Sequence, residues 1–592
     1  MDGLGGTLAD SALTRLFLGE RRSEEVASFS LPGGKVLFAA GEPAEALYFV
    51  RTGRLGVVRR EEGQDQQFLG VVKPGEPVGE MALVAGLPHS ATVIALRDSE
   101  ILALPRSAFF AEARRRPELM AELARLMIVR VRETGVRAGG GDPAVFGFVG
   151  VAPGLAVREL VEAVERRVCA DGFTATVLGA ECAGAPTEWF SNVELSHDYV
   201  LYAAEADETA WAEVCGRQVD RLFLVGKGGS APPAQPSAFA AEAMRQNRLM
   251  DLVLLHAPET ASPRGSDAWL DAAPATRLFH VRRGDGGDLG RLARILTARS
   301  VGLVLSGGAA RAYAHVGAIR ALREAGTPID FVGGTSMGGI VGAAVAMGWD
   351  DDEIAERIRA AFVDSSPVAD IAFPMIAMTR GREVKARLGE HFGEVQIPDL
   401  WRPFFCVSSN LTTAQHQVHR RGDLAEALRA SSALPGVLPP VVVGEDVLVD
   451  GALLRNFPTD VMKAWNRGPI VGVDVSSSTG LAKDDIAPPA SMAHWILSGE
   501  FLRGPPIVSL LMRAATISTD RELTAAREAT ELLILPQVQH IEIRDWKAFE
   551  PAVAAGRAAA EAALRTCGPV TELRRKKLAQ SAAAVSLPAP PP

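Results

Sequence analysis

Short apolar runs separated by polar turns occupy the first part of this chain, from about residue 14 to about residue 110. Five of these runs have the length of a β-strand, and they lie at 35–38, 46–50, 55–58, 91–95 and 100–104. Strand-length runs at this spacing are typical of a small β-barrel or β-roll. An amphipathic pattern over 118–132 predicts a helix after them, and the glycine-rich stretch 138–143 predicts a linker.

The next part of the chain, 144–298, alternates continuous apolar runs with helical stretches. The apolar runs lie at 145–149, 199–202, 221–225 and 252–255, and a helical pattern at 156–169 follows the first of them. Strands that are apolar throughout and separated by helices predict a parallel sheet covered on both faces. We therefore expect a middle Rossmann-like α/β domain.

The same alternation of strands and helices continues over 299–575, and the last residues, 576–592, are rich in alanine and proline. That composition predicts a disordered tail. The expected architecture is multidomain α/β, with a β-roll over 1–138, a Rossmann-like domain over 144–298 and an α/β/α domain over 299–575. The length of 592 residues agrees, because it exceeds what a single hydrophobic core usually organises.

Composition and charge narrow the class of function. Hydrophobic residues make up 47% of the chain and charged residues 22%, as in an ordinary globular protein. The net charge of -9 argues against a nucleic-acid partner held through phosphate contacts. Five cysteines without CxxC spacing support neither a zinc site nor a disulfide framework. Without a secretory signal or an apolar run of about 18 residues, we expect a cytoplasmic protein that meets a membrane only transiently and at its surface.

A Gly-x-Ser-x-Gly sequence lies within the third part of the chain. Ser336 stands between Gly334 and Gly338, after a short strand pattern at 329–332 and before a helical stretch of small residues at 340–346. A serine on such a strand-to-helix turn presents its hydroxyl at a helix N-terminus, with glycines relieving the crowding. The context predicts a nucleophile elbow.

Two further motifs flank this serine. The loop 306–311 follows a strand pattern at 301–305 and precedes a helix at 314–325, so its backbone N–H groups can converge on an anion. Asp450 ends a strand at 447–449 and is followed by Gly451. We expect that strand to end a βα unit on the same sheet edge as Ser336. Such edges collect functional residues, which favours a functional role for Asp450. A nucleophile, a base and an oxyanion-binding loop are the parts that acyl transfer needs.

Together these motifs resemble the patatin-like phospholipases over about 300–470. The resemblance rests on the glycine loop, on 334–338, on 429–436, and on 450–452 with Asn456 and Pro458. It implies a dyad in which Ser336 is the nucleophile and Asp450 takes its proton directly. It also implies support of the glycine loop by Arg311, and no metal or organic cofactor. The implied oxyanion donors are the backbone N–H groups of Gly307, Gly308 and Ala309.

The glycine loop departs from the family pattern at two positions, where Ala309 and Ala312 replace glycines. An alanine keeps its N–H but costs about 1–2 kcal/mol if the loop requires a left-handed conformation. A triad in the order Ser, Asp, His is an alternative, with His494 and His540 as candidates, although neither lies in a partner motif. We expect His315 to pack against the loop or support it.

A second resemblance lies in the N-terminal part. Residues 79–84 and 87–93 resemble the phosphate-binding cassette of cyclic nucleotide-binding domains, and Glu80 matches the glutamate that holds the ribose. The arginine that pairs with the cyclic phosphate in that family is replaced by His89, which lacks the charged fork of arginine. A cyclic nucleotide is therefore a doubtful effector, and a degenerate sensor or docking module is favoured. The cassette positions are Gly79, Glu80, Met81, Ala82, His89 and Ser90.

The order of these parts resembles neuropathy target esterase and its bacterial relatives. The resemblance implies a lipid acyl hydrolase that acts on phospholipid or lysophospholipid esters and is regulated through its N-terminal domain. A regulatory or scaffolding protein with a decayed active site is the alternative from another class, because both the glycine loop and the cassette have lost family residues. The apolar stretches 495–497 and 506–512 are candidates for the border of an acyl site or a membrane face.

Overall fold

The fold is described from a computed structural model. The described residues are 11–19, 25–59, 67–136, 143–185, 187–236, 239–240, 250–273, 275–365, 370–372, 376–476, 519–543 and 545–577. His494, the stretches 495–497 and 506–512, and all of the predicted tail except its first two residues lie outside them.

The chain divides into two compact units. One comprises Met1–Lys227, Pro232–Leu255 and Leu270–Arg277. The other comprises Gly228–Ala231, His256–Trp269 and Leu278–Pro592. The domain boundaries expected near residues 138–144 and 298–299 stay predictions.

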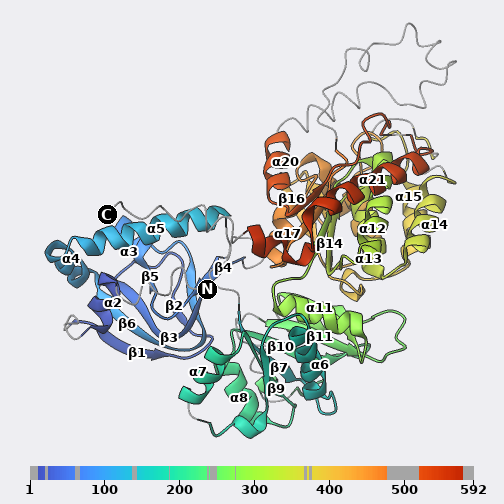
Figure 1. The fold of residues 1–592 in the computed structure, drawn as a ribbon. Coiled ribbons are helices and arrows are strands. Elements are labelled where there is room, and N and C mark those ends of the chain that lie inside the picture. The colour runs from blue at the N-terminus through green and yellow to red at the C-terminus, as the bar shows by residue number, and fades with distance from the viewer. Residues whose placement is uncertain are drawn as a thin grey trace. The chain divides into compact units, whose positions relative to one another are not determined.

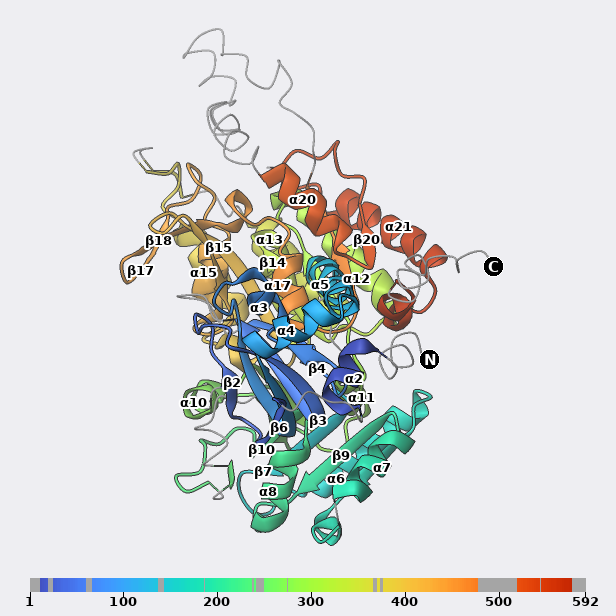
Figure 2. The same ribbon diagram turned by 90° about the vertical axis from the view of Figure 1, so that its left-hand side faces the viewer.

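The first unit begins with a β-roll, as the strand pattern predicted. Its two longest strands, β3 (Ala46–Arg59) and β6 (Thr92–Pro105), pair antiparallel and run side by side in Figure 2. Each was predicted as two short strands, and that prediction was wrong because bulges bend these strands without ending them. Gly53 takes a φ of 89° in β3, where an added Cβ would lie 2.2 Å from Oγ of Ser99. The other elements of the roll are β1 (Ala27–Leu31), β2 (Val36–Phe38), β4 (Gln67–Val72), β5 (Pro77–Val78), α3 (Glu80–Ala85), α4 (Arg106–Arg115) and α5 (Glu118–Val136).

The middle α/β sheet confirms the Rossmann-like prediction. Its strand order is β12-β11-β10-β7-β9-β8, and the register of β8, β9, β7, β10 and β11 is parallel throughout. The sequence analysis missed β8 and β12, because Thr176 interrupts the apolar run in one and His280 interrupts it in the other. The strands are β7 (Val145–Gly150), β8 (Ala175–Leu178), β9 (Tyr199–Ala204), β10 (Arg221–Lys227), β11 (Met250–His256) and β12 (Arg277–Arg282), and the helices that pack beside them include α6 (Val157–Ala170), α7 (Thr187–Ser196) and α8 (Thr209–Gln218).

The second unit is built on a mixed sheet with the order β17-β18-β15-β14-β13-β19-β20. The central strands β13, β14 and β15 are buried along their whole length, as strands covered on both faces must be. Helix α13 packs on β13, β14 and β15, and α17 packs on β13, β14 and β19; Figure 1 shows the two helices on opposite sides of β14. This arrangement confirms the expected α/β/α layers. The strands are β13 (Gly302–Leu305), β14 (Phe331–Thr335), β15 (Phe404–Asn410), β16 (Gln415–His419), β17 (Val441–Val443), β18 (Asp446–Asp450), β19 (Ile470–Val473) and β20 (Leu532–Ile534), and the helices include α12 (Ala314–Glu324), α13 (Met337–Met347), α14 (Asp351–Phe362), α15 (Arg382–Phe392), α16 (Leu424–Ser431), α17 (Thr459–Trp465), α20 (Thr519–Glu528) and α21 (Phe549–Cys567).

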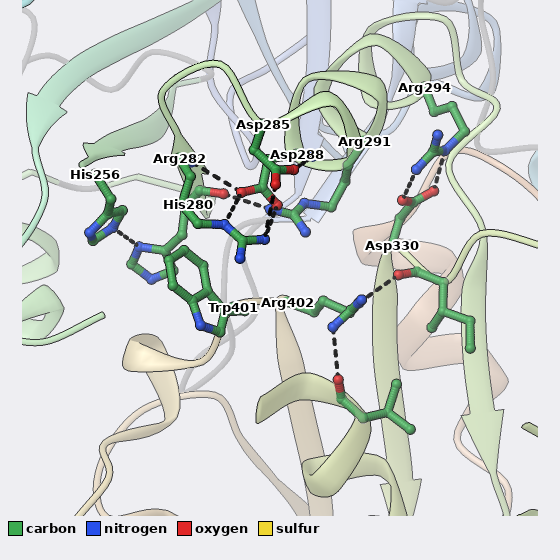
Figure 3. A network of polar contacts seen from close by, with 12 residues as sticks. His256, His280, Arg282, Asp285, Asp288, Arg291, Arg294, Asp330, Trp401 and Arg402 are labelled. Atoms are coloured by element: carbon green, nitrogen blue, oxygen red, sulfur yellow. Dashed lines mark hydrogen bonds and ion pairs between the residues drawn. The ribbon is translucent and has the colours of Figure 1, made fainter. Parts of the chain in front are cut away.

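A buried polar network holds the starting ends of β14 and β15 (Figure 3). Asp330, just before β14, accepts two hydrogen bonds from Arg294 of α11 (Gly286–Leu296), at 2.6 and 2.9 Å. Arg402, just before β15, donates to the carbonyls of Ile329 and Val345, each at 3.0 Å. Paired or hydrogen-bonded charges are tolerated in a core, whereas unpaired ones are not. The network therefore fixes the two strands at the ends opposite Ser336.

A histidine pair belongs to the same network. Nε2 of His280 lies 2.7 Å from the carbonyl of Pro398, and Nδ1 lies 2.9 Å from Nε2 of His256. A carbonyl can only accept, so His280 carries its proton on Nε2 and accepts a hydrogen bond from His256. Burial lowers the pKa of His280 to about 3, which keeps this arrangement uncharged at neutral pH. Trp401 packs against both rings.

No helix among the described residues is long and apolar enough to span a bilayer.

Candidate active site

Ser336 lies on a tight turn between β14 and α13. Its φ of 55° is in the left-handed range, and with ψ of -130° this is a strained conformation for a residue with a side chain. The flanking glycines are required by space. A Cβ on Gly334 would lie 2.7 Å from the backbone of Gly338, and a Cβ on Gly338 would lie 2.4 Å from the carbonyl oxygen of Ser306. The local geometry is that of a nucleophile elbow.

The Ser336 hydroxyl donates to the carboxylate of Asp450, with Oγ and Oδ2 2.6 Å apart. The other carboxylate oxygen accepts the N–H of Ala452 at 2.9 Å. Both side chains are buried. Burial raises the pKa of Asp450 to about 6, and the two hydrogen bonds oppose that rise. An ionised carboxylate at this distance can accept the serine proton without an intervening histidine.

Strand register explains how Ser336 and Asp450 meet. Thr335, the last residue of β14, pairs with Val407 of β15 in parallel, and Asp450, the last residue of β18, pairs with Ser408 in antiparallel. The C-terminal ends of β14 and β18 therefore lie next to neighbouring residues of β15, one on each side of it. We expected Asp450 to end a βα unit, and that expectation was wrong, because β18 is antiparallel and a short 3₁₀ turn follows it.

Gly451 and Ser431 shape the junction between the two strand ends. A Cβ on Gly451 would lie 2.2 Å from the carbonyl oxygen of Val407, so no side chain fits after Asp450. The hydroxyl of Ser431 donates to that same carbonyl at 2.6 Å and accepts the N–H of Ser336 at 2.9 Å. Ser431 thereby ties the elbow to β15.

Asn456 holds the start of the glycine loop. Its Oδ1 accepts the N–H of Gly307 at 3.1 Å. The roles of Ser431 and Asn456 were missed by the sequence analysis, although both lie in motifs that carry the patatin resemblance. The partners of Ser431 and Asn456 are 95 and 149 residues away in the sequence, so local patterns could not indicate these contacts. The only signal in the sequence was that both residues lie in family motifs.

The glycine loop leaves two N–H groups open. The N–H of Gly307 is engaged by Asn456, and that of Ala310 donates to the carbonyl of Ile543 at 3.1 Å. Within the described part of the chain, nothing accepts a hydrogen bond from the N–H of Gly308 or Ala309. Adjacent free backbone donors are what an oxyanion site requires. The expected set of three donors therefore contains one whose N–H already has an acceptor.

Arg311 ties the glycine loop to a segment that is distant in the sequence. Its Nε donates to the carbonyl of Ile541 at 2.7 Å. Burial lowers the pKa of Arg311. His315 holds Ser306, the first residue of the loop, since its Nε2 lies 2.8 Å from the carbonyl oxygen of Ser306. Burial lowers the pKa of His315 to about 4, so it is neutral and donates that hydrogen bond.

The two alanines of the loop differ in conformation. Ala309 takes a φ of 48°, so the loop does require a left-handed residue there. Ala312 lies in the 3₁₀ turn Ala309–Tyr313 and is buried without such strain.

Substituting Ala309→Gly is expected to raise the free energy of unfolding by about 1 kcal/mol, because relief of the left-handed conformation outweighs the added freedom of the unfolded chain. Ala312→Gly is the matched control and should lower it by about 1 kcal/mol, since its conformation is helical. Urea unfolding measures both. Equal destabilisation by the two glycines would contradict this account of the loop.

A role of Asp450 as the base predicts that the rate of ester hydrolysis depends on pH. Its carboxylate must be ionised to accept the Ser336 proton, and its pKa is about 6. We expect kcat/KM to be level above pH 7 and to fall about tenfold per pH unit below pH 6. Hydrolysis of a soluble ester over pH 4.5–9 measures this. A profile that stays level down to about pH 4.5 would contradict Asp450 as the base.

The two candidate histidines that the structure describes, His315 and His540, do not hydrogen-bond to this pair. His540 is exposed, His494 lies outside the described residues, and His315 bonds to Ser306. Within the ranges that the structure describes, no histidine hydrogen-bonds to Ser336 or Asp450. The direct contact between the Ser336 hydroxyl and the Asp450 carboxylate is the geometry that a dyad requires.

Comparison with known proteins agrees with these features. The chain matches the family model of the patatin-like phospholipases over residues 303–463, that of the cyclic nucleotide-binding domain over 28–116, and that of the neuropathy target esterase family P-loop like domain over 183–285. It is 32% identical over 565 residues to an uncharacterised NTE family protein of Mycobacterium tuberculosis, covering 92% of this chain and 93% of that protein. The chain belongs to the neuropathy target esterase family.

Two further comparisons cover smaller shares. The human patatin-like phospholipase domain-containing protein 6 is 28% identical over 597 residues, which span 88% of this chain and 43% of the human protein. A cyclic nucleotide-binding domain from Methylobacillus flagellatus is 25% identical, covers 19% of this chain and 66% of its own, and has a TM-score of 0.18.

Three cassette residues of this family member, Glu80, Ala82 and His89, are buried. Gly79 takes a φ of 87° and precedes α3, which begins with the buried Glu80, the exposed Met81 and the buried Ala82. His89 is buried and stacks on Phe38, with ring centroids 3.7 Å apart. Burial lowers the pKa of His89, although Glu42 and Glu80 oppose this. A neutral, stacked imidazole offers no cation to a cyclic phosphate; Ser90 is exposed.

Calorimetry with cAMP and with cGMP is expected to show no saturable binding at concentrations up to about 100 µM, because the cassette lacks the charged fork that cyclic phosphate requires. Binding with a micromolar Kd would contradict this prediction.

Proposed function

We propose that this chain is a serine lipid acyl hydrolase that cleaves carboxylic esters of phospholipids or lysophospholipids. The observation that carries the proposal is the buried 2.6 Å contact between the Ser336 hydroxyl and the Asp450 carboxylate, beside a loop with two free backbone N–H groups. A paired nucleophile and base next to oxyanion donors support acyl transfer.

Ser336 attacks the ester carbonyl while its proton passes to Asp450. The tetrahedral oxyanion receives hydrogen bonds from the N–H groups of Gly308 and Ala309. Protonated Asp450 then gives the proton to the departing alkoxide, leaving an acyl-enzyme. Water then attacks the acyl-enzyme carbonyl while Asp450 takes one of its protons. The resulting tetrahedral intermediate collapses and releases the fatty acid, and Asp450 returns the proton to the Ser336 oxygen.

Family relatives support the lipid substrate, since the ester chemistry alone would suit many esters. The matched family model is described as a patatin-like phospholipase, and related proteins carry the names patatin-like phospholipase domain-containing protein and neuropathy target esterase. Membrane contact is proposed as transient. A docking or regulatory role is proposed for the N-terminal β-roll, because His89 stands in its cassette where the family has the arginine that pairs with the cyclic phosphate.

The test is release of fatty acid from lysophosphatidylcholine and phosphatidylcholine by the purified full chain, with Ser336→Ala as the blank. Release of fatty acid by the wild-type protein, and none by Ser336→Ala, supports the proposal. A folded wild-type protein without activity on either lipid or on a soluble ester would favour the scaffolding alternative instead.

A further inference from the structure

The outer end of the hairpin formed by β17 and β18 carries exposed apolar side chains next to the candidate site. Val442 is 66% exposed and Val443 is 56% exposed, and Leu411, just beyond β15, is 55% exposed. Figure 2 shows the two strands projecting from the sheet beside β15. We use the term apolar hairpin end for Leu411, Val442 and Val443.

Strand pairing places these three residues together. Val442 pairs with Val447, and the carbonyl of Val447 accepts the N–H of Leu411 at 2.8 Å. Paired residues share one face of a sheet, so Leu411 and Val442 lie on the same face. Val443 is the next residue along the strand and faces the opposite side. One face of the hairpin end therefore carries Leu411 and Val442, and the other carries Val443 opposite Asp446.

The hairpin end lies close to the candidate dyad. The row before it, with Val441 and Leu448, is buried in a small core. Asp450 ends the same strand four residues after Asp446, which is roughly 14 Å at the usual rise of a strand.

Charge distinguishes the kinds of surface. Neither 403–419 nor 430–454 contains a lysine or arginine, and the hairpin turn carries Glu445 and Asp446. Attraction to anionic lipid or to an acidic partner needs basic residues. A protein partner would cover one face of the hairpin. A lipid interface would surround both faces of a hairpin that is inserted shallowly into it.

We propose that the apolar hairpin end docks this protein onto an uncharged or zwitterionic lipid surface, delivering the ester to Ser336 from that side. This inference rests on the proposed function. The inference extends the proposed function by naming the docking element and the class of lipid surface.

The test is co-sedimentation of the full chain, in the Ser336→Ala background, with vesicles of phosphatidylcholine. We expect binding that Val442→Asp with Val443→Asp reduces about tenfold or more. Raising NaCl from roughly 0.05 to 0.5 M should leave binding unchanged. Leu195→Asp, at an apolar residue that is 86% exposed on α7, is the matched control and should bind as the parent does.

The outcomes separate the docking proposal from the proposed function. The double variant in the active background should hydrolyse a soluble ester normally and vesicle lipid poorly. Vesicle binding without any hydrolysis by the active protein would sink the function and leave the docking. No binding to phosphatidylcholine, equal binding by the double variant, or binding that needs phosphatidylserine and fails in salt would overturn the docking. A concentration-dependent dimer that the double variant does not form would also overturn the docking, because a second copy of the chain would then cover the hairpin end.

Discussion

Replacing Ser336 with alanine is expected to lower kcat/KM for lysophosphatidylcholine by about 10⁴-fold or more, because the acyl-enzyme can no longer form. The fold should persist, since the substitution keeps the Cβ and removes one hydroxyl, whose hydrogen-bond partner among the described residues is Asp450. Steady-state release of fatty acid measures the loss, and circular dichroism checks the fold.

Ser409→Ala is the matched control. Ser409 lies in β15, is buried, and its hydroxyl has no hydrogen-bond partner within the described residues. Its removal deletes the same group from the same sheet, one residue beyond the pairing partner of Asp450. Activity within about threefold of wild type is expected. A Ser336→Ala protein with more than about a tenth of wild-type activity would show that another group is the nucleophile.

Replacing Asp450 with asparagine is expected to change activity and stability in opposite directions. Loss of the base should lower kcat/KM by about 10³-fold or more. The fold should gain up to about 3 kcal/mol at pH 8, because burial raises the pKa of Asp450 from 3.8 to about 6 and each unit is worth about 1.4 kcal/mol.

The sign follows from proton binding. A carboxyl whose pKa is raised by folding holds its proton more tightly in the folded state, so its contribution to stability is lost as pH rises from about 4 to about 6. Asparagine stays neutral and avoids that loss. The gain over wild type should therefore be large at pH 8 and vanish near pH 4.

Asp330→Asn provides the contrast. Asp330 is also buried, but Arg294 pairs with it, so removing its charge should destabilise the fold by about 3 kcal/mol or more and leave the dyad in place. Urea unfolding at pH 8 measures both variants. An Asp450→Asn protein that is less stable than wild type at pH 8 would contradict the account of a destabilising buried charge.

Local patterns in the sequence were sufficient where local physics decides the structure. The glycines around Ser336 predict a tight strand-to-helix turn, because a side chain at Gly334 or Gly338 has no room. The apolar runs predict buried parallel strands, and β13 and β14 are buried throughout.

Long-range pairing was beyond those patterns. The antiparallel direction of β18 depends on its register with β15, which the run at 447–449 does not encode. The same holds for the bond between Asn456 and Gly307, which removes one of the three expected oxyanion donors. In the β-roll, bulges carry β3 and β6 through positions where the pattern indicated turns.

Reaction of the purified full chain with a fluorophosphonate, followed by peptide mass mapping, tests the central claim most directly. The dyad predicts one adduct, located on Ser336, absent from Ser336→Ala and formed much more slowly by Asp450→Asn. A folded wild-type protein that stays unlabelled, or that carries the adduct on another residue, would contradict Ser336 as the nucleophile.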